Sequence, residues 1–413
     1  MPSEALVIGG GLVGLSCALN LQLCGLRTTI VDPATTRRAA SWGNAGHLAT
    51  EQVEPLASRK TLRNLPRRLF SRGGALSLSP RDLDVWLPFA LRLVGNSTPV
   101  RFATGKATLR SLLRGAIPAW RQLARTAGAE HLIAEDGHFV VWETPAGADA
   151  GRAAWRNADT GTATFRDATA EEIATLSAQV SRPIAGAIRF QGTGQVLDLG
   201  ELADSLSRHL TRAGGAERTA RVERLVVDGS TAAAMLEGGE VLHADIVVVA
   251  AGVASGALLE PLGYAVPIIA ERGYHIQSAD AAWPAGLPPV VFEERSMIVT
   301  PFRSGLRAAS FVEFARAESP PDPRKWARLR RHAAELGLPL REPYSEWFGA
   351  RPTLPDYLPA LGRSRRTANL LYAFGHQHLG LTLAAVTGEL IAALARGEAS
   401  DVDLKPLDLE RFR

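Results

Sequence analysis

A glycine-rich turn near the N-terminus has the residue types and spacing that bind a phosphate group. The turn, Gly9-Gly10-Gly11-Leu12-Val13-Gly14, fits the pattern G-x-G-x-x-G. The first glycine permits a tight turn, the second lets the backbone approach a pyrophosphate, and the third lets a helix pack closely on a strand. Asp32 lies 18 residues after Gly14 and can accept hydrogen bonds from a ribose diol.

A βαβ unit of about 30 residues must hold this turn in place. Residues 4–9 (EALVIG) are predicted to form a short apolar strand, and residues 27–32 (RTTIVD) a second strand that ends in Asp32. Between them, residues 12–24 place leucines on one face of a helix. The N-terminus of this helix offers free N–H groups and partial positive charge to phosphates. The sequence therefore predicts dinucleotide binding, but it does not choose between FAD and NAD.

Two later segments are predicted to return to the same sheet. Asp245–Ala250 (DIVVVA) is nearly all apolar, as expected of a strand buried on both faces, and it ends at Ala251-Gly252, where backbone can approach a ligand. Residues 369–374 are predicted to form another strand, followed by a helix from about 381 to 396. An ordinary NAD-dependent dehydrogenase continues directly with more βα units, whereas this chain has a long middle region. A discontinuous nucleotide domain with an inserted second domain favours a flavoprotein.

The motifs resemble the D-amino-acid oxidase-like (DAO) family of FAD-dependent oxidoreductases, and within it the branch of bacterial D-amino acid dehydrogenases. Eight segments carry the resemblance, in the family order, over more than 350 residues: VIGGGLVGLSCALNL at 7–21, SWGNAGH at 41–47, GQVLDLGELADSL at 194–206, ADIVVVAAG at 244–252, RGYH at 272–275, VTPFRSGLRAASFVEFA at 299–315, WFGARPTLPDYLPALG at 347–362 and AFGHQHLGLTLAAVTGELIA at 373–392.

The resemblance implies an α/β fold with two parts. One is a discontinuous, Rossmann-like FAD-binding domain of the glutathione-reductase type, and the other is an inserted substrate domain of antiparallel sheet and helices. We expect FAD-binding parts at 1–55, 196–265 and 345–413, and substrate or cap parts at 56–195 and 266–344.

The resemblance also implies which residues contact FAD. The loop at 41–47 is expected beside the isoalloxazine ring, Val222 beside adenine, and the N-terminus of the 381–396 helix at the N1/C2=O edge, where a helix dipole favours the reduced flavin. The alternative for Asn44 is a turn residue in a left-handed conformation. The full expected set is Gly9, Gly11, Leu12, Val13, Gly14, Asp32, Ser41, Asn44, Ala45, Gly46, Val222, Ala251, Gly252, Gly375, Gly380, Leu381 and Thr382.

On the substrate side, Arg351 matches the family arginine that binds the substrate carboxylate, and a guanidinium can do so through two parallel N–H donors. Tyr274 matches a region that often adds a tyrosine, with an aromatic in a sheet face as the alternative. His47 and His378 are expected to flank the pocket, although each could be structural. The position of His378 is an arginine in glycine-oxidase-like members, which puts the carboxylate contacts in doubt. His376 is assigned a structural or flavin-facing role.

The implied reaction is oxidative deamination of a small D-amino acid. Hydride passes from Cα to flavin N5, and water hydrolyses the imino acid to a 2-oxo acid and ammonia. We name no catalytic base, because a substrate with a neutral amine needs none. The electrons are expected to reach a quinone or similar acceptor. Two alternatives remain open: a secondary-amine specialist acting on D-proline, cis-4-hydroxy-D-proline, glycine or sarcosine, and a flavin subunit of a multi-chain dehydrogenase.

Composition limits the other classes of function. The net charge of +4 comes without the clustering of a nucleic-acid footprint. Cys17 and Cys24 lack disulfide or metal-ligand spacing, so we identify no metal site and expect non-covalent FAD. We see no secretion signal and no apolar run of membrane-spanning length, and expect a cytoplasmic protein of undetermined oligomeric state. Residues 59–72 combine six bases with apolar residues and could contact an anionic membrane, or form a solvated loop.

Overall fold

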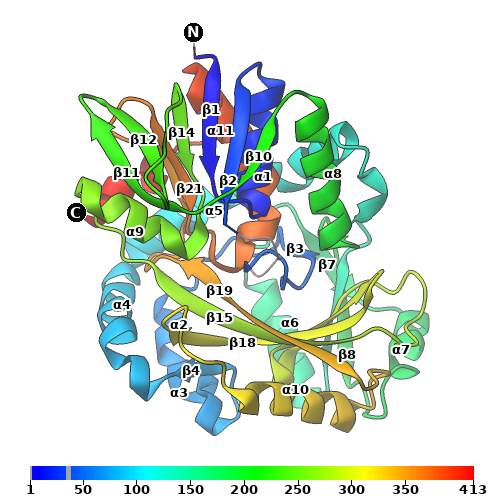
Figure 1. The fold of residues 1–413 in the computed structure, drawn as a ribbon. Helices are drawn as coiled ribbons and strands as arrows, with labels where there is room; N and C mark the ends of the chain where they lie inside the picture. Colours follow the sequence, from blue (N-terminus) through cyan, green and yellow to red (C-terminus); the bar gives the residue numbers. More distant parts are fainter. Residues whose placement is uncertain (1, 34–38) are drawn as a thin grey trace.

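The computed structural model describes residues 2–33 and 39–413, and it places two sheets in separate halves of the molecule (Figure 1). The upper sheet has six strands in the order β10-β2-β1-β14-β21-β20. All neighbours are parallel except the β20–β21 pair. Their bounds are β1 Glu4–Ile8, β2 Arg27–Asp32, β10 Ala216–Thr219, β14 Ile246–Val249, β20 Ala360–Arg363 and β21 Leu370–Phe374.

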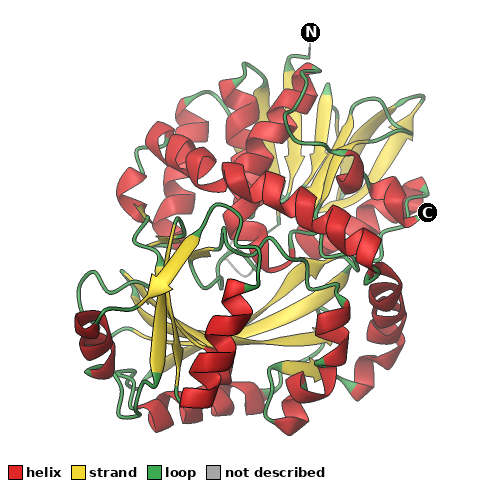
Figure 2. Cartoon of the chain, turned by 180° about the vertical axis from the view of Figure 1, so that it is seen from behind, coloured by secondary structure: helices red, strands yellow, loops and turns green. Residues whose placement is uncertain are grey.

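Helices cover one face of this sheet, as the view from behind shows (Figure 2). Helix α1 packs on α11 and α8, and α11 also packs on α5. The βαβ unit, the strand at 246–249 and the C-terminal strand and helix are confirmed, whereas β10 was not predicted. The helices are α1 Leu12–Leu23, α5 Pro99–Thr126, α8 Leu199–Arg212 and α11 Gly380–Arg396.

The other face of the upper sheet carries a small antiparallel sheet, in the order β11-β12-β13, and the short helix α9. Leu225 and Ala234 of the small sheet pack with Val247 and Val249 of β14 in one apolar core. This places two layers on opposite faces of a central parallel sheet, which buries β14 on both faces. The bounds are β11 Val222–Asp228, β12 Thr231–Leu236, β13 Val241–Leu242 and α9 Ser255–Leu259.

The lower half is built on a nine-stranded, mainly antiparallel sheet in the order β19-β15-β18-β17-β16-β6-β8-β7, with β4 beside β18. Only the β16–β6 and β18–β4 pairs are parallel. The strands are β4 Leu76–Leu78, β6 His138–Trp142, β7 Thr164–Asp167, β8 Gly186–Gln191, β15 Ile269–Ser278, β16 Val290–Phe292, β17 Met297–Phe302, β18 Gly305–Ala315 and β19 Tyr344–Thr353.

Several helices surround the lower sheet, and α10 packs directly on β15 and β18. The stretch 59–72, read as one basic segment, forms two short helices and a 3-10 turn at Phe70–Arg72. The remaining helices are α2 Arg59–Arg63, α3 Leu65–Arg68, α4 Leu83–Asn96, α6 Pro145–Arg156, α7 Ala170–Ser177 and α10 Pro323–Leu336.

A third, small sheet lies where the chain passes between the halves. It joins β3 (His47–Leu48), β9 (Gly194–Val196) and β5 (Ile133–Ala134), three segments far apart in the sequence. Strand β19 pairs with β15 in the lower sheet, although residues 345–413 were assigned to the FAD-binding part. Helix α5 packs on α11 of the upper half, although it lies within the predicted cap segment 56–195.

One stretch, Gln377–Arg396, is long and apolar enough to cross a membrane by length and composition. The sequence analysis had found no such run. In the fold, 72% of its most apolar window is buried, because α11 packs between α1 and α5. The stretch therefore has the surroundings of a core helix.

Candidate functional site

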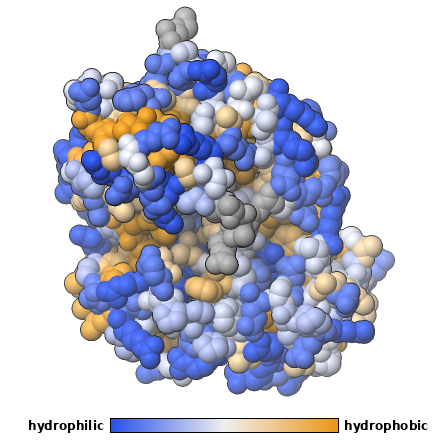
Figure 3. All heavy atoms as spheres, viewed as in Figure 1, coloured by the Kyte–Doolittle hydropathy of each residue, from blue (hydrophilic) through white to orange (hydrophobic). Residues whose placement is uncertain are grey.

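A large cavity of about 1970 Å³ runs between the two halves. It extends from Asp32 and Val222 in the upper half to Arg351 and Tyr274 on the lower sheet. The surface is hollowed between the halves, with apolar residues at the rim (Figure 3). Ligand pockets for drug-sized molecules are typically about 300–1,000 Å³, so this cavity has room for a dinucleotide and a small second molecule.

At the upper end, two glycines of the turn, Gly9 and Gly14, lie too close to neighbouring backbone for any side chain. A Cβ atom on Gly14 would lie 1.8 Å from the carbonyl oxygen of Gly9, and one on Gly9 would lie 2.5 Å from that of Ala250. Gly9 also has a φ of +113°, which favours glycine. The turn thus lets helix α1 begin directly against β1 and β14.

Two polar side chains fix the turn. Asp32, at the end of β2, accepts a hydrogen bond from Gly10 N at 2.6 Å. The hydroxyl oxygen of Ser41 accepts one from Leu12 N at 3.1 Å, which satisfies a free N–H in the first turn of α1. Both side chains line the cavity. Their position suits the ribose and pyrophosphate of a dinucleotide.

The loop at 41–47 is held by a buried arginine that the sequence analysis missed. Arg307, in β18, donates to the carbonyl oxygens of Trp42 and Asn44. Burial lowers the pKa of Arg307 to about 10. The Asn44 side chain accepts a hydrogen bond from Gly46 N at 2.8 Å, which makes a local turn. The loop is therefore anchored by contacts between distant strands, for which its own sequence gives no signal.

The N-terminus of α11 also lines this cavity. Gly380 and Leu381 line it, and Trp120 of α5 donates its indole N–H to Leu381 O at 2.8 Å. The Thr382 hydroxyl oxygen accepts a hydrogen bond from Ala49 N at 3.0 Å. Gly375 adopts a φ of +80° in the turn before this helix. The first N–H groups of a 17-residue helix thus lie beside the cavity, where they favour negative charge.

Twelve of the expected cofactor residues line the cavity, and five lie behind its wall. The lining residues are Gly9, Gly11, Val13, Asp32, Ser41, Asn44, Ala45, Val222, Ala251, Gly252, Gly380 and Leu381. Those that support the wall from behind are Leu12, Gly14, Gly46, Gly375 and Thr382.

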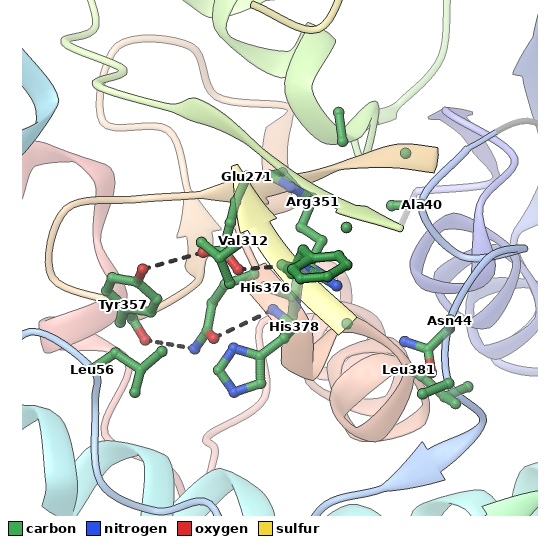
Figure 4. A pocket seen from close by; sticks show the side chains of 18 of the residues that line it. Ala40, Asn44, Leu56, Glu271, Val312, Arg351, Tyr357, His376, His378 and Leu381 are labelled. Carbon is green, nitrogen blue, oxygen red and sulfur yellow. Dashed lines mark hydrogen bonds and ion pairs between the residues drawn. The ribbon is translucent and has the colours of Figure 1, made fainter. Parts of the chain in front are cut away.

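Arg351 lies on β19 at the lower side of the cavity, opposite the start of α11 (Figure 4). Its Nη1 donates to Phe311 O at 3.2 Å and contacts Glu271 Oε1 at 3.3 Å. Its side chain is 26% exposed, and its other guanidinium nitrogens have no partner among the described residues. Arg351 can therefore present two N–H donors to a planar anion in the cavity.

Glu271 is the residue of this site that the sequence analysis did not find. It is buried in β15, and its second carboxylate oxygen accepts from the hydroxyls of Thr353 at 3.1 Å and Tyr357 at 3.2 Å. Burial, followed by the charge of Glu271, raises the pKa of Tyr357 well above its ordinary value. Glu271 and Arg351 together form a charge pair whose open side is the guanidinium.

The structure does not bring the Tyr274 hydroxyl to Arg351, although we expected it near the substrate carboxylate. It donates to Glu313 Oε2 at 2.6 Å and accepts from Arg272 Nη2 at 3.1 Å. Lys325 Nζ holds the other oxygen of Glu313 at 2.8 Å. The hydroxyl is committed to this buried ionic cluster, because four polar groups there need one another as partners. Tyr357 occupies the position beside the charge pair instead.

The histidines of the 376–378 motif point in different directions. Both residues line the cavity, and the Nε2 of His378 lies 2.6 Å from Gln52 Oε1. The Nε2 of His376 lies 3.0 Å from the Thr387 hydroxyl of α11, a contact inside the helix region. Burial lowers the pKa of each histidine to about 4, so both imidazoles are neutral at pH 7. His47, in β3, also lines the cavity, where it contacts Glu51.

These residues fit FAD. The upper end offers a glycine-rich turn and an acid for the ribose, and the cavity continues to a helix N-terminus that suits the anionic edge of a flavin. The remaining space borders a guanidinium. Bound there, FAD supplies the group that accepts hydride from a substrate.

Comparisons with known proteins identify the family of the chain. The sequence model of the family described as FAD dependent oxidoreductase (DAO) matches residues 4–394. A D-amino-acid oxidase of Bradyrhizobium diazoefficiens is 31% identical over 417 residues, which cover 98% of each chain. A D-amino acid dehydrogenase of Cereibacter sphaeroides is 28% identical and covers 98% of this chain and 94% of its own.

Solved structures show the same fold. Iminodiacetate oxidase from Chelativorans sp. BNC1 matches with a TM-score of 0.73 at 22% identity, and the alignment covers 98% of each chain. Glycine oxidase from Geobacillus kaustophilus also gives 0.73 at 22% identity, over 99% of this chain and 98% of its own. With the family match spanning nearly the whole sequence, the chain belongs to the DAO family of FAD-dependent oxidoreductases.

Proposed function

We propose that the chain oxidises the Cα–N bond of a small D-amino acid, giving an imino acid and then a 2-oxo acid. The observation that carries this proposal is the open side of Arg351, which faces the cavity opposite the N-terminus of α11. The relative named D-amino-acid oxidase, at 31% identity over nearly the full length, supports the substrate class and its stereochemistry.

In this proposal the protein positions the substrate so that a bound FAD would take hydride from its Cα. Arg351 binds the carboxylate through paired N–H donors, while Glu271 holds the guanidinium in place. His378 and Gln52 close the pocket beside them. His378 is neutral at pH 7, because burial lowers its pKa to about 4, so it adds no charge that would compete for the carboxylate.

A dye-reduction screen over D- and L-amino acids tests the proposal directly. The wild-type holoenzyme is expected to reduce an artificial acceptor with one or more small D-amino acids. Arg351→Met is the matched variant, because it keeps the length of the side chain and removes the donors. Activity confined to L-amino acids would contradict the stereochemistry, and unchanged KM values in Arg351→Met would contradict the role of the arginine.

A secondary amine remains the second candidate substrate. The cavity wall near Arg351 includes the apolar residues Phe311 and Val312, and this favours a ring such as that of D-proline or cis-4-hydroxy-D-proline. The same screen separates the two candidates when it includes both prolines, glycine and sarcosine. Gel filtration of the purified chain tests the further alternative of a flavin subunit that requires partner chains.

We also propose a quinone or similar acceptor, with the protein in the cytoplasm on the inner face of the membrane. Residues 59–72 expose their bases, but their leucines and Phe70 are half-buried, so they do not supply an apolar face. Helix α4 supplies one, since Leu91 is 67% exposed in a stripe with three similar residues (Figure 3, lower left). The stripe is Leu83, Leu87, Leu91 and Val94.

Vesicle flotation with anionic lipids tests membrane contact. The double variant Leu87→Ser/Leu91→Ser is expected to float less than the wild type, and Arg67→Gln/Arg68→Gln is expected to float less at low salt and to show a weaker dependence on salt. Leu23→Ser is the control, because Leu23 is an exposed leucine of α1 on the upper half. Equal flotation of all variants would remove the membrane from the proposal.

We propose that FAD is bound without a covalent link. Cys17 is buried in α1, where burial raises the pKa of its thiol, and Cys24 lies at the other end of the same helix. Neither residue lines the cavity. Acid precipitation is expected to release the flavin into the supernatant, and a yellow pellet would contradict the proposal.

A further inference from the structure

Two histidines and a glutamate from distant parts of the chain meet at the edge of the cavity. His47 lies in β3, Glu51 follows in the next loop, and His138 begins β6 of the lower sheet. One ring nitrogen from each histidine and one carboxylate oxygen all lie within 4.8 Å of one another. All three residues line the cavity, so the cluster can be reached from it.

The hydrogen bonds around His47 leave two acceptor atoms, its Nε2 and Glu51 Oε1, facing each other. Its Nδ1 lies 3.2 Å from the carbonyl oxygen of Gly194, and a carbonyl can only accept, so Nδ1 carries hydrogen. In the neutral ring, Nε2 then points a lone pair at Glu51 Oε1, 3.1 Å away. Two acceptors at that distance need a cation between them, either a proton or a metal ion.

Glu51 has a second oxygen without a partner. The residue is only 3% exposed, and its Oε2 is buried with no hydrogen-bond partner among the described residues. A buried carboxylate oxygen without a partner has a large desolvation cost, which a metal ion offsets directly.

His138 has the properties of a metal ligand. Its Nδ1 lies 2.9 Å from the Thr193 hydroxyl, and its ring stacks on Phe190 at 4.6 Å between centroids. Both histidines thus have a polar group that fixes the ring from behind, as metal-binding histidines commonly do.

We propose that His47, Glu51 and His138 bind a divalent transition-metal ion of the zinc class, with one coordination position open to the cavity. Two imidazoles and a carboxylate are a known donor set for Zn²⁺, and the fourth position takes water or an oxygen of a bound ligand. Tetrahedral zinc holds such donors about 3.4 Å apart, so separations of up to 4.8 Å must shorten on binding. The proposal does not depend on which amino acid the enzyme oxidises.

Metal binding to the flavin-loaded, tag-free protein is the direct test. After chelator treatment and dialysis, the protein competes for Zn²⁺ with a chromophoric zinc indicator. The wild type is expected to bind one equivalent. Glu51→Gln and His138→Gln are each expected to weaken binding at least tenfold, since each removes one of three ligands. His131→Gln is the matched control, because it removes an exposed histidine that contacts a carboxylate, Glu201.

A second readout separates a lost ligand from a damaged fold. Stoichiometric Zn²⁺ is expected to raise the Tm of the wild type and of His131→Gln, but not that of Glu51→Gln, which keeps the shape of the side chain. Flavin content per chain reports whether each variant is folded. Failure of the wild type to bind one equivalent, or equal binding by a flavin-loaded Glu51→Gln, overturns the proposal and leaves a proton shared between His47 and Glu51.

Discussion

The two ends of the cavity present different kinds of groups to a ligand. At the upper end, ligand-facing groups are mostly backbone, in the Gly9–Gly14 turn, Ala251-Gly252 and the first residues of α11. At the lower end they are side chains of two neighbouring strands, with Arg351 on β19 and Glu271 on β15 in register. An atom added at Gly9 or Gly14 would collide with neighbouring backbone, whereas a side-chain site can change its chemistry by substitution. We therefore expect substitutions at the upper end to abolish FAD binding, and substitutions at the lower end to change KM by degrees.

The largest effect is expected at Gly14. A Cβ there would lie 1.8 Å from Gly9 O, a backbone atom that cannot move without opening the contact between α1 and β1. Gly14→Val is therefore expected to abolish FAD binding and give a colourless protein. The ratio of flavin absorbance to protein absorbance measures this.

Gly95→Ala is the control for this substitution, since Gly95 is a helical glycine of α4 with nothing within 4 Å of an added Cβ. It is expected to keep its flavin. A yellow Gly14→Val protein with a normal flavin ratio would show that the upper end also tolerates side chains, and the comparison would fail.

The second effect is expected at Arg351. Arg351→Met removes the paired donors and is expected to raise KM for the amino acid about 100-fold, since charge-assisted pairs contribute about 3 kcal/mol. Arg351→Lys keeps the positive charge but lacks the two parallel N–H donors, and it is expected to raise KM about tenfold. Flavin content is expected to stay normal, which distinguishes this end from the upper one.

Arg330→Lys is the matched control, because Arg330 forms an exposed pair with Glu346 and does not itself line the cavity. Exposed pairs of this kind contribute little, so KM is expected to change less than twofold. A KM that does not respond to Arg351→Met, or a parallel loss of flavin, would remove the arginine from the substrate end.

The upper end could be predicted from the sequence because its signals are local. The turn, the acid after β2 and the start of the C-terminal helix each lie within one short segment, and packing only had to bring the segments together. Strand β10 was missed because its four residues, Ala216–Thr219, are largely exposed and carry no apolar pattern.

The lower end could be predicted only in part, because its partners are set by strand register. Arg351 was found through a family motif, but Glu271 lies 80 residues earlier and meets it only because β15 and β19 pair. The register also decided where the Tyr274 hydroxyl points. In the same way, His138 lies 87 residues after Glu51, so no spacing rule could indicate a metal site.

The third effect is expected at Glu271. Glu271→Gln keeps hydrogen-bonding atoms for Thr353 and Tyr357 but no longer attracts Arg351, so KM is expected to rise about fivefold to tenfold with little change in kcat. In the Arg351→Met background, Glu271 is a buried carboxylate without its cation. Adding Glu271→Gln there is expected to raise Tm rather than lower it. If the effects of the two substitutions on KM and on Tm simply add in the double variant, the two residues act separately.

The smallest effect is expected at His376 and His378, on the pH dependence of stability. The folded pKa of each is about 4, below the ordinary 6.5, so the unfolded chain binds more protons between these values. Stability is thus expected to be full above pH 6.5 and to fall as the pH drops towards 4. At pH 4.5, replacing one such histidine by glutamine removes about 2 kcal/mol of this loss. Urea unfolding at pH 7 and 4.5 measures this change in stability for both variants.

The two variants are expected to differ in KM. His376→Gln is expected to flatten the pH dependence of stability with KM unchanged, because its contact with Thr387 lies inside the helix region. His378→Gln is expected to flatten the pH dependence and also to change KM. Equal KM changes in both variants would mean that the motif does not separate the cofactor end from the substrate end.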